Sequence, residues 1–199
     1  MDLIRPLIGD KPVISTGMTQ EVARVGAALD EALAGRRVAL VSSGDPGIYA
    51  MAGLALELCE ARNVKAAPVW GADGGLTLEV VPGIPALCAG AALLGAPLTH
   101  DFAAISLSDL LTPWETIEKR IELAAQGDFI IVLYNPKSKK RDWQLGAVRD
   151  LLLKTYSPQT PVGIVRRAMR QGQEIVLTNL AELLKHPIDM QTIIIVGNS

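Results

Sequence analysis

Residues 38–55 read VALVSSGDPGIYAMAGLA, and this stretch carries the strongest fold signal in the chain. The uninterrupted run VALVS, with its two β-branched valines, is typical of a parallel strand that is buried on both faces. Gly44 and Gly47 then permit a sharp turn and a close approach of the backbone to a ligand. A strand that passes through a glycine loop into a helix is where open α/β sheets bind small molecules.

Asp45 and Pro46 in this loop have two interpretations. Both residue types are favoured at a helix N-cap and in the first helical turn, so Asp45 could act only as a cap. Asp45 could equally belong to a ligand-binding loop. Local chemistry gives the two interpretations equal weight.

The composition predicts a globular protein with an aliphatic core. The 199 residues are 49% hydrophobic and only 4% aromatic, and the net charge of -2 argues against general nucleic-acid binding. Cys59 and Cys88 form no CxxC pair, which disfavours a zinc site and a disulfide framework and favours a reduced, cytoplasmic setting. The start lacks an apolar core of signal-peptide length, and the small-apolar region 86–98 is too short to span a bilayer.

Helix and strand signals alternate along the whole chain, which is typical of parallel sheets covered by helices. The expected strands are 12–14, 38–42, 66–69, 77–81, 129–134, 162–166, 174–177 and 192–196. The expected helices are 19–33, 47–62, 84–94, 112–125 and 143–154, with a short one ending at 185. Thr112, Pro113 and Glu115 form a strong helix-start signature, and Asn179 with Glu182 suggests another capping box.

Residues 103–111, AAISLSDLL, are the expected hinge between two halves. The chain is therefore expected to form two α/β domains, 1–106 and 107–199. A cleft between two such lobes is the natural place for a site.

Several catalytic motifs are missing from the sequence. His100 and His186 stand in no metal-ligand spacing, so no metal site is expected. Neither a GxSxG elbow nor a GxxxxGK[ST] loop occurs, and SSGDPG supplies only part of a dinucleotide fingerprint. On local grounds a structural or capping role for His100 is favoured over acid/base chemistry.

Two further loops resemble the first in design. Residues 82–85, PGIP, precede the small-residue stretch ALCAGAALLG, which suits close helix packing or a ligand. Residues 134–136, YNP, end an apolar run and precede KSKKR, which is either a solvated basic turn or, with Arg166, Arg167 and Arg170, a site for a polyanionic small molecule.

Taken in order, SSGDPGIYAMA, VPGIPA, HDFAAISLSDLLTPW, YNPKSKKR and GIVRRAMRQGQE resemble the tetrapyrrole methylases over essentially the whole chain. The resemblance implies two α/β domains with a cleft that binds S-adenosylmethionine, and usually a homodimer. It is strongest to the branch that methylates C(17) of precorrin-3B, or of its cobalt form, with ring contraction, in cobalamin biosynthesis. Such methyl transfer needs positioning and exclusion of water rather than a metal or a covalent nucleophile.

The resemblance also assigns roles to residues. Cofactor binding is expected at Gly44, Asp45, Ile48, Pro85, Ala86, Asn135, Ala168 and Thr178. The candidates for the proton transfers of ring contraction are His100, Asp101, Asp109 and Tyr134. Substrate carboxylates are expected to meet Lys137, Lys139, Lys140 and Arg141.

The chain departs from the family pattern at both ends. Members of the family begin with a further strand, a GxGPGD-type loop and a helix, and they continue into a closing hairpin after the position of Ser199. An open position in a sheet predicts strand exchange or tight dimerisation. Two other functions stay open: a shortened, catalytically weak protein that acts as a binding or assembly partner, and a different nucleotide-binding α/β protein.

Overall fold

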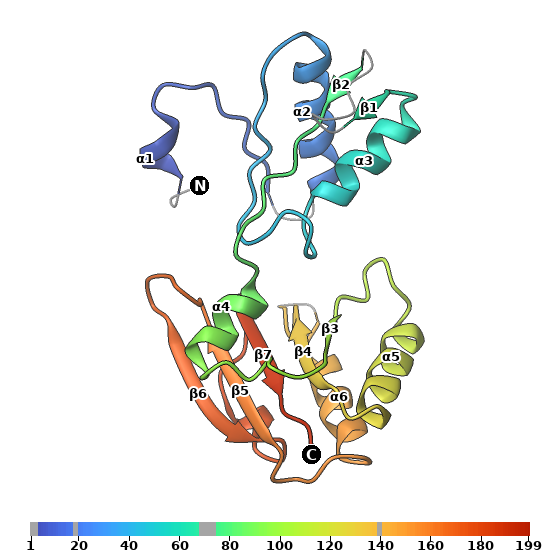
Figure 1. The fold of residues 1–199 in the computed structure, drawn as a ribbon, viewed down its shortest axis with the longest axis vertical. Coiled ribbons are helices and arrows are strands. Elements are labelled where there is room, and N and C mark those ends of the chain that lie inside the picture. The colour runs from blue at the N-terminus through green and yellow to red at the C-terminus, as the bar shows by residue number, and fades with distance from the viewer. Residues whose placement is uncertain (1–3, 18–19, 68–74, 139–140) are drawn as a thin grey trace. The chain divides into compact units, whose positions relative to one another are not determined.

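The computed structural model describes residues 4–17, 20–67, 75–138 and 141–199. It divides into two compact units, Met1–Gly83 and Ile84–Ser199, which are described one at a time (Figure 1). This boundary precedes the one expected after residue 106. The difference arises because α4 (Ala86–Leu93) and β3 (Phe102–Ser106) belong to the second unit, so residues 103–106 of the expected hinge are part of a strand.

The first unit is built around two helices. It contains α1 (Arg5–Ile8), α2 (Glu21–Leu33), α3 (Ala52–Ala61) and a parallel pair of short strands, β1 (Ala66–Ala67) and β2 (Leu76–Thr77). Val25 and Leu29 of α2 and Ala55 and Cys59 of α3 are each one turn apart, so each pair lies on one helix face. These faces meet in a small buried cluster that also contains Met51.

Four expectations for this unit are wrong. Residues 12–14 and 38–42 form no strand, the expected strand 77–81 is reduced to the end of β2, and the helix expected from 47 begins at Ala52. The run VALVS keeps its strand-forming residues, but none of the described residues gives its backbone a hydrogen-bonded partner. A strand is defined by its neighbour, so composition alone does not make one. Residues 68–69 of the expected strand 66–69 lie outside the described residues.

The second unit contains one five-stranded sheet in the order β3-β4-β7-β5-β6. Its other strands are β4 (Ile130–Tyr134), β5 (Pro161–Arg166), β6 (Glu174–Asn179) and β7 (Thr192–Val196). Only β3 and β4 pair in parallel, and the remaining pairs are antiparallel. The expectation of a parallel sheet is therefore wrong here, because β7 inserts between β4 and β5 in the opposite direction.

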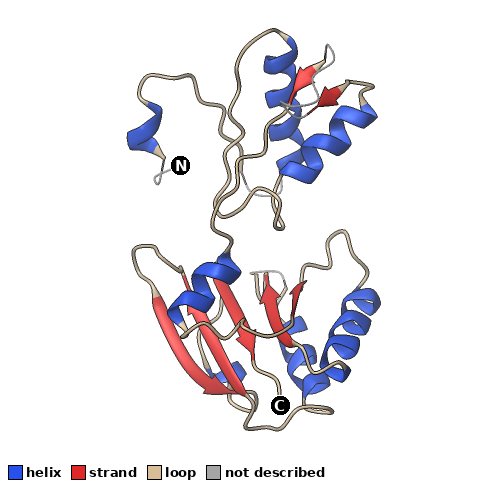
Figure 2. Ribbon diagram, in the orientation of Figure 1, coloured by secondary structure: helices blue, strands red, loops and turns tan. Residues whose placement is uncertain are grey.

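Helices cover both faces of this sheet (Figure 2). Along β4, Ile131 and Leu133 pack in the cluster with α5 (Trp114–Gln126) and α6 (Gln144–Leu152), while Ile130 and Val132 pack in the cluster with α4. This alternation explains why the strand is apolar throughout. Gly90, in the middle of α4, lets this helix pack closely against Ile193 of β7. Close helix packing therefore accounts for the small residues of α4.

Two of the helix starts that the sequence predicts can be compared with the structure. Pro113, with ψ of 141°, is the extended N-cap residue of α5, so the helix starts one residue after the position expected for its first turn. Asn179 performs its expected role, because its side-chain oxygen accepts a hydrogen bond from the Glu182 amide at 3.0 Å ahead of the 3-10 helix η2 (Leu183–Lys185). Among the described residues, no helix combines the length and apolar character needed to cross a bilayer.

Candidate functional site

The carboxyl ends of β3, β4 and β5 lie at one edge of the second unit's sheet. The pairings align Ser106 with Tyr134 and Arg166 with Thr192, and β7 runs opposite to both β4 and β5. The segments at this edge are 107–109, 135–138 with Arg141, 167–169, and the turn 189–191 before β7, called here the carboxyl-edge loops. Open α/β sheets bind ligands outside the carboxyl ends of their strands.

Arg141 connects three of these loops. Its Nη1 donates to the carbonyl oxygens of Leu107 at 2.8 Å and of Asn135 at 2.7 Å. Its Nε lies 3.8 Å from Asp109 Oδ1, and its Nη2 lies 3.6 Å from Met190 Sδ. Burial lowers the pKa of Arg141 from its usual value and the charge of Asp109 opposes this, so the guanidinium remains charged.

The neighbours of Arg141 are also held in place. The other carboxylate oxygen of Asp109 accepts a hydrogen bond from Gln144 Nε2 at 2.8 Å, and Gln144 itself is buried. Asn135 Nδ2 donates to Ser106 Oγ at 2.9 Å. The ends of β3 and β4 and the start of α6 therefore form one polar network.

Backbone conformation at this edge is unusual. Asn135, Arg167 and Met169 have φ of 51°, 52° and 58°, in the left-handed region that side-chain-bearing residues seldom adopt. Such residues gather at functional sites because the surrounding structure must hold them there. Within the described residues, the amides of Asn135 and Ala168 donate no hydrogen bond, which leaves two backbone donors for an acceptor-rich ligand.

Tyr134 brings the start of α4 to the same edge. Its hydroxyl oxygen accepts a hydrogen bond from the Leu87 amide at 3.0 Å and so satisfies one of the open donors in the first turn of α4. The structure therefore brings together seven of the expected site residues: Pro85, Ala86, Asp109, Tyr134, Asn135, Arg141 and Ala168.

Three expected residues lie elsewhere. His100 and Asp101 precede β3, and the five residues of this strand separate them from Asp109 by roughly 16 Å. Thr178 pairs with Val162, at the amino end of β5, while Ala168 follows the carboxyl end of that strand. His100, Asp101 and Thr178 are not assembled with the carboxyl-edge loops, because β3 runs away from His100 and Asp101 and β6 runs antiparallel to β5.

In the first unit, Asp45 joins the two glycine loops. Its Oδ1 accepts a hydrogen bond from the Gly47 amide at 2.8 Å, and its Oδ2 accepts one from the Gly83 amide at 3.0 Å. The Gly83 amide, followed by that of Gly47, holds the pKa of this carboxyl below its usual value. Asp45 is not a helix cap, since α3 begins only at Ala52.

The two glycines of this region have different structural roles. Gly44 has a φ of 84°, which favours glycine. A side chain at Gly83 would place its Cβ 2.2 Å from the Gly44 carbonyl oxygen, so the close approach of the two loops requires glycine there. The expected cofactor-binding Ile48 is 40% exposed on the same loop.

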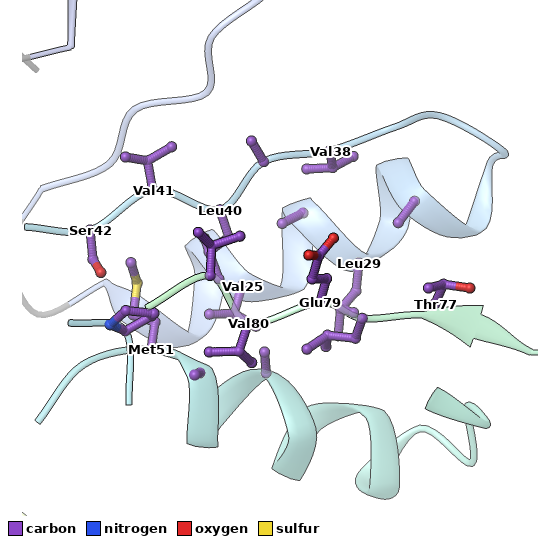
Figure 3. Close-up of a pocket in the computed structure, with 18 of the residues that line it drawn as sticks. Val25, Leu29, Val38, Leu40, Val41, Ser42, Met51, Thr77, Glu79 and Val80 are labelled. Carbon is purple, nitrogen blue, oxygen red and sulfur yellow. The ribbon is translucent and has the colours of Figure 1, made fainter. Parts of the chain in front are cut away.

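A groove of about 850 Å³ extends from these loops along the first unit (Figure 3). Its lining comes from α2, the start of α3, and the extended segments 38–42 and 76–83. Figure 3 shows Val38, Leu40 and Val41 on one segment and Glu79 and Val80 on the other. The groove is mainly apolar, and Gly44 and Gly83 lie among its lining residues.

The basic segment is described in part. Lys137 is exposed, whereas Lys139 and Lys140 lie outside the described residues. Within the described ranges, no group of three or more His, Cys, Asp or Glu side chains is placed to hold a metal ion. Sequence reasoning missed Ser106 and Gln144, which carry no motif, and the role of Gly83, for which the Pro-Gly pair was the available signal.

Comparison with known proteins shows the family to which the chain belongs. A sequence profile for Tetrapyrrole (Corrin/Porphyrin) Methylases matches residues 3–184. The chain is 50% identical to a cobalt-factor III methyltransferase of Priestia megaterium, 48% to a probable cobalt-factor III C(17)-methyltransferase of Salmonella typhimurium, and 42% to a precorrin-3B C(17)-methyltransferase of a Sinorhizobium species. These alignments cover 100%, 98% and 95% of the chain, and 36%, 77% and 72% of the three relatives.

Solved structures agree with the sequence comparison. The crystal structure of the methyltransferase CobJ superposes with a TM-score of 0.80 at 37% identity, covering 98% of this chain and 80% of CobJ. A uroporphyrin-III C-methyltransferase of Thermus thermophilus, solved with S-adenosylhomocysteine, shares the fold with a TM-score of 0.64 at 23% identity, covering 92% of this chain and 75% of that one. The chain belongs to the tetrapyrrole methylase family.

Proposed function

We propose that this protein transfers a methyl group from S-adenosylmethionine to C(17) of a corrin precursor, coupled to ring contraction, in cobalamin biosynthesis. The observation that carries the proposal is the 48% identity to a probable C(17)-methyltransferase over 98% of the chain. The chain spans about a third of its Priestia relative, so the activity is proposed for the protein as given and needs a direct test.

The cobalt form of the substrate is the first to test. The relatives that are 50% and 48% identical are named for cobalt-factor III, while the precorrin-3B enzyme is 42% identical. Precorrin-3B is the second substrate. The cobalt in the name of the first substrate belongs to the macrocyclic substrate and is not a metal of the protein.

The described residues suit S-adenosylmethionine. The donors at Asn135 and Ala168 match the acceptor atoms of an adenosyl group, and Pro85 and Ala86 add apolar surface beside them. In the first unit, the cofactor contacts are assigned to Gly44, Asp45 and Ile48. The bound cofactor supplies an activated methyl group, and the residues around it need only orient the acceptor carbon and exclude water.

Proton transfer during ring contraction is assigned to Tyr134 or Asp109. Both lie at the carboxyl edge, whereas His100 and Asp101 lie across the sheet from it. Substrate carboxylates are assigned to the lysines of the basic segment, of which Lys137 is exposed. A homodimer in the cytoplasm completes the proposal, and light scattering tests its oligomeric part.

The deciding experiment separates cofactor binding from catalysis. Calorimetry with S-adenosylhomocysteine measures binding, and mass spectrometry after incubation with S-adenosylmethionine and cobalt-factor III, or precorrin-3B, detects a gain of one methyl group. Binding and methyl transfer are the expected results. Binding of neither cofactor nor substrate contradicts the proposal, and binding without transfer supports a binding or assembly partner instead.

A further inference from the structure

We infer that Arg141 is a positioning residue that sets the backbone of the carboxyl-edge loops for the cofactor, and is not itself a partner of substrate carboxylates. The inference rests on the proposed function for the identity of the ligand. Its structural part stands on the contacts of this side chain alone. The inference gives the basic segment two different roles: Arg141 holds the protein's own backbone, and the exposed Lys137 is open to a substrate carboxylate.

The first support is that Arg141 binds backbone carbonyls of two loops at once. The Nη1 group donates to Leu107, just after β3, and to Asn135, just after β4. These are the only two strands that pair in parallel in the described sheet, so their loops leave the sheet in the same direction. A planar guanidinium holds two such acceptors at a fixed separation, which an ammonium on a flexible stem does not.

The second support is that the remaining side of the guanidinium also faces the protein. Asp109 lies next to Nε, and Met190, in the turn before β7, lies next to Nη2. The side chain is only 11% exposed. Little of the guanidinium is left for a substrate carboxylate, whereas the exposed Lys137 on the same segment is open to one.

The third support is what Arg141 holds. Asn135 has a left-handed backbone, and its carbonyl is fixed by Arg141 while its side chain is fixed by Ser106. These two bonds set the direction of the Asn135 amide, one of the backbone donors at this edge that has no acceptor among the described residues. The loss of Arg141 should therefore release the donor although Asn135 itself is unchanged.

The test compares Arg141→Lys, Arg141→Ala and the matched control Arg149→Lys. Arg149 lies on α6 in the same unit, and among the described residues its guanidinium bonds only to the neighbouring Asp150. Calorimetry measures affinity for S-adenosylhomocysteine and for uroporphyrin III, a carboxylate-rich tetrapyrrole used as a substrate probe. Amide hydrogen exchange is followed at 107–109 and 135–138, with β4 and β7 as the check on folding.

Both Arg141 variants should weaken S-adenosylhomocysteine binding by up to about tenfold, the scale of one hydrogen bond between neutral groups. Exchange in the two loops should accelerate while β4 and β7 stay protected, and Arg149→Lys should behave as wild type. Uroporphyrin III affinity should change little. The inference is overturned if Arg141→Lys binds the cofactor product as wild type does, or if only Arg141→Ala loses affinity for uroporphyrin III.

The two proposals fail in different ways. Wild-type protein that does not bind S-adenosylhomocysteine contradicts the proposed function. The exchange measurement then still decides the role of Arg141, because unchanged exchange in both loops of Arg141→Lys excludes positioning whatever the ligand is.

Discussion

Replacement of Gly90 by alanine tests how closely α4 approaches the sheet. A Cβ built at Gly90 lies 2.7 Å from Ile193 Cγ2, well inside van der Waals contact. Ile193 is 2% exposed and β-branched, so it has little freedom to move away. Overpacking in a dense core costs about 1–3 kcal/mol, whereas glycine to alanine in a helix gains about 1 kcal/mol.

The packing penalty should exceed the helix gain. We expect Gly90→Ala to lower the free energy of unfolding by about 1 kcal/mol. Gly146 of α6 is the matched control, because its Cβ would meet Leu184 Cδ1 at an ordinary 3.8 Å. Gly146→Ala should therefore stabilise the same unit by about 0.5–1 kcal/mol, the helix gain alone.

Urea denaturation, followed by tryptophan fluorescence and far-ultraviolet circular dichroism, measures both variants against wild type. The double variant Gly90→Ala with Ile193→Ala should show non-additive free energies, since removal of the Ile193 side chain also removes the clash. If Gly90→Ala proved as stabilising as Gly146→Ala, the close approach of α4 to β7 would be refuted. The small residues of α4 would then need another explanation, such as a ligand.

Three further variants test single polar contacts. The pKa of the Asp45 carboxyl is lowered in the folded state. The ionised carboxylate therefore stabilises the fold at a pH above its ordinary pKa of about 4, and this stabilisation is lost as the pH falls through the lowered pKa. Asp45→Asn should abolish this pH dependence in thermal melts between about pH 3 and 7. Tyr134→Phe leaves the Leu87 amide without its hydroxyl acceptor and should cost about 1–3 kcal/mol in urea denaturation, while unchanged stability would show that water replaces the hydroxyl. Tyr156→Phe removes a 2.7 Å hydrogen bond to the Phe129 carbonyl and should cost about 1 kcal/mol by the same measurement, with exchange accelerated at the start of β4.

The sequence predicted the central strands of the second unit to within a residue. The expected runs 129–134, 162–166 and 192–196 correspond to β4, β5 and β7. These strands are buried on both faces, so nearly every position is apolar and the pattern is unambiguous. By contrast, β3 was taken for a hinge, because an edge strand is paired on one side only and its residues are half buried and partly small.

The run 38–42 shows the opposite failure. Like β5 it contains two valines, yet among the described residues it has no ladder and its valines Val38 and Val41 are 42% and 50% exposed. Local composition reports a preference for extended backbone, and that preference is met here. Pairing requires a second segment at the right distance, which no pattern within the run encodes.

The sequence predicted which loops carry the site residues, but it did not predict which of these loops contact one another. Turn chemistry located the segments around Asp45, Pro85 and Asn135, because glycine, proline and asparagine mark the ends of strands. Which of these ends share an edge depends on the direction of each strand, and the insertion of β7 reversed what a parallel sheet implied. The antiparallel pairing of β5 and β6 separates Thr178 from Ala168, although both were expected at the cofactor site.

Arg141 illustrates why charge alone did not reveal its role. In the sequence it ends a basic run and looks equivalent to the lysines before it. In the structure its guanidinium reaches back across its own loop to two carbonyls, a contact that depends on the parallel pairing of β3 and β4. At Arg141 we therefore expect fixed geometry to matter more than charge, and Arg141→Lys isolates that difference because it keeps the charge and removes the planar group.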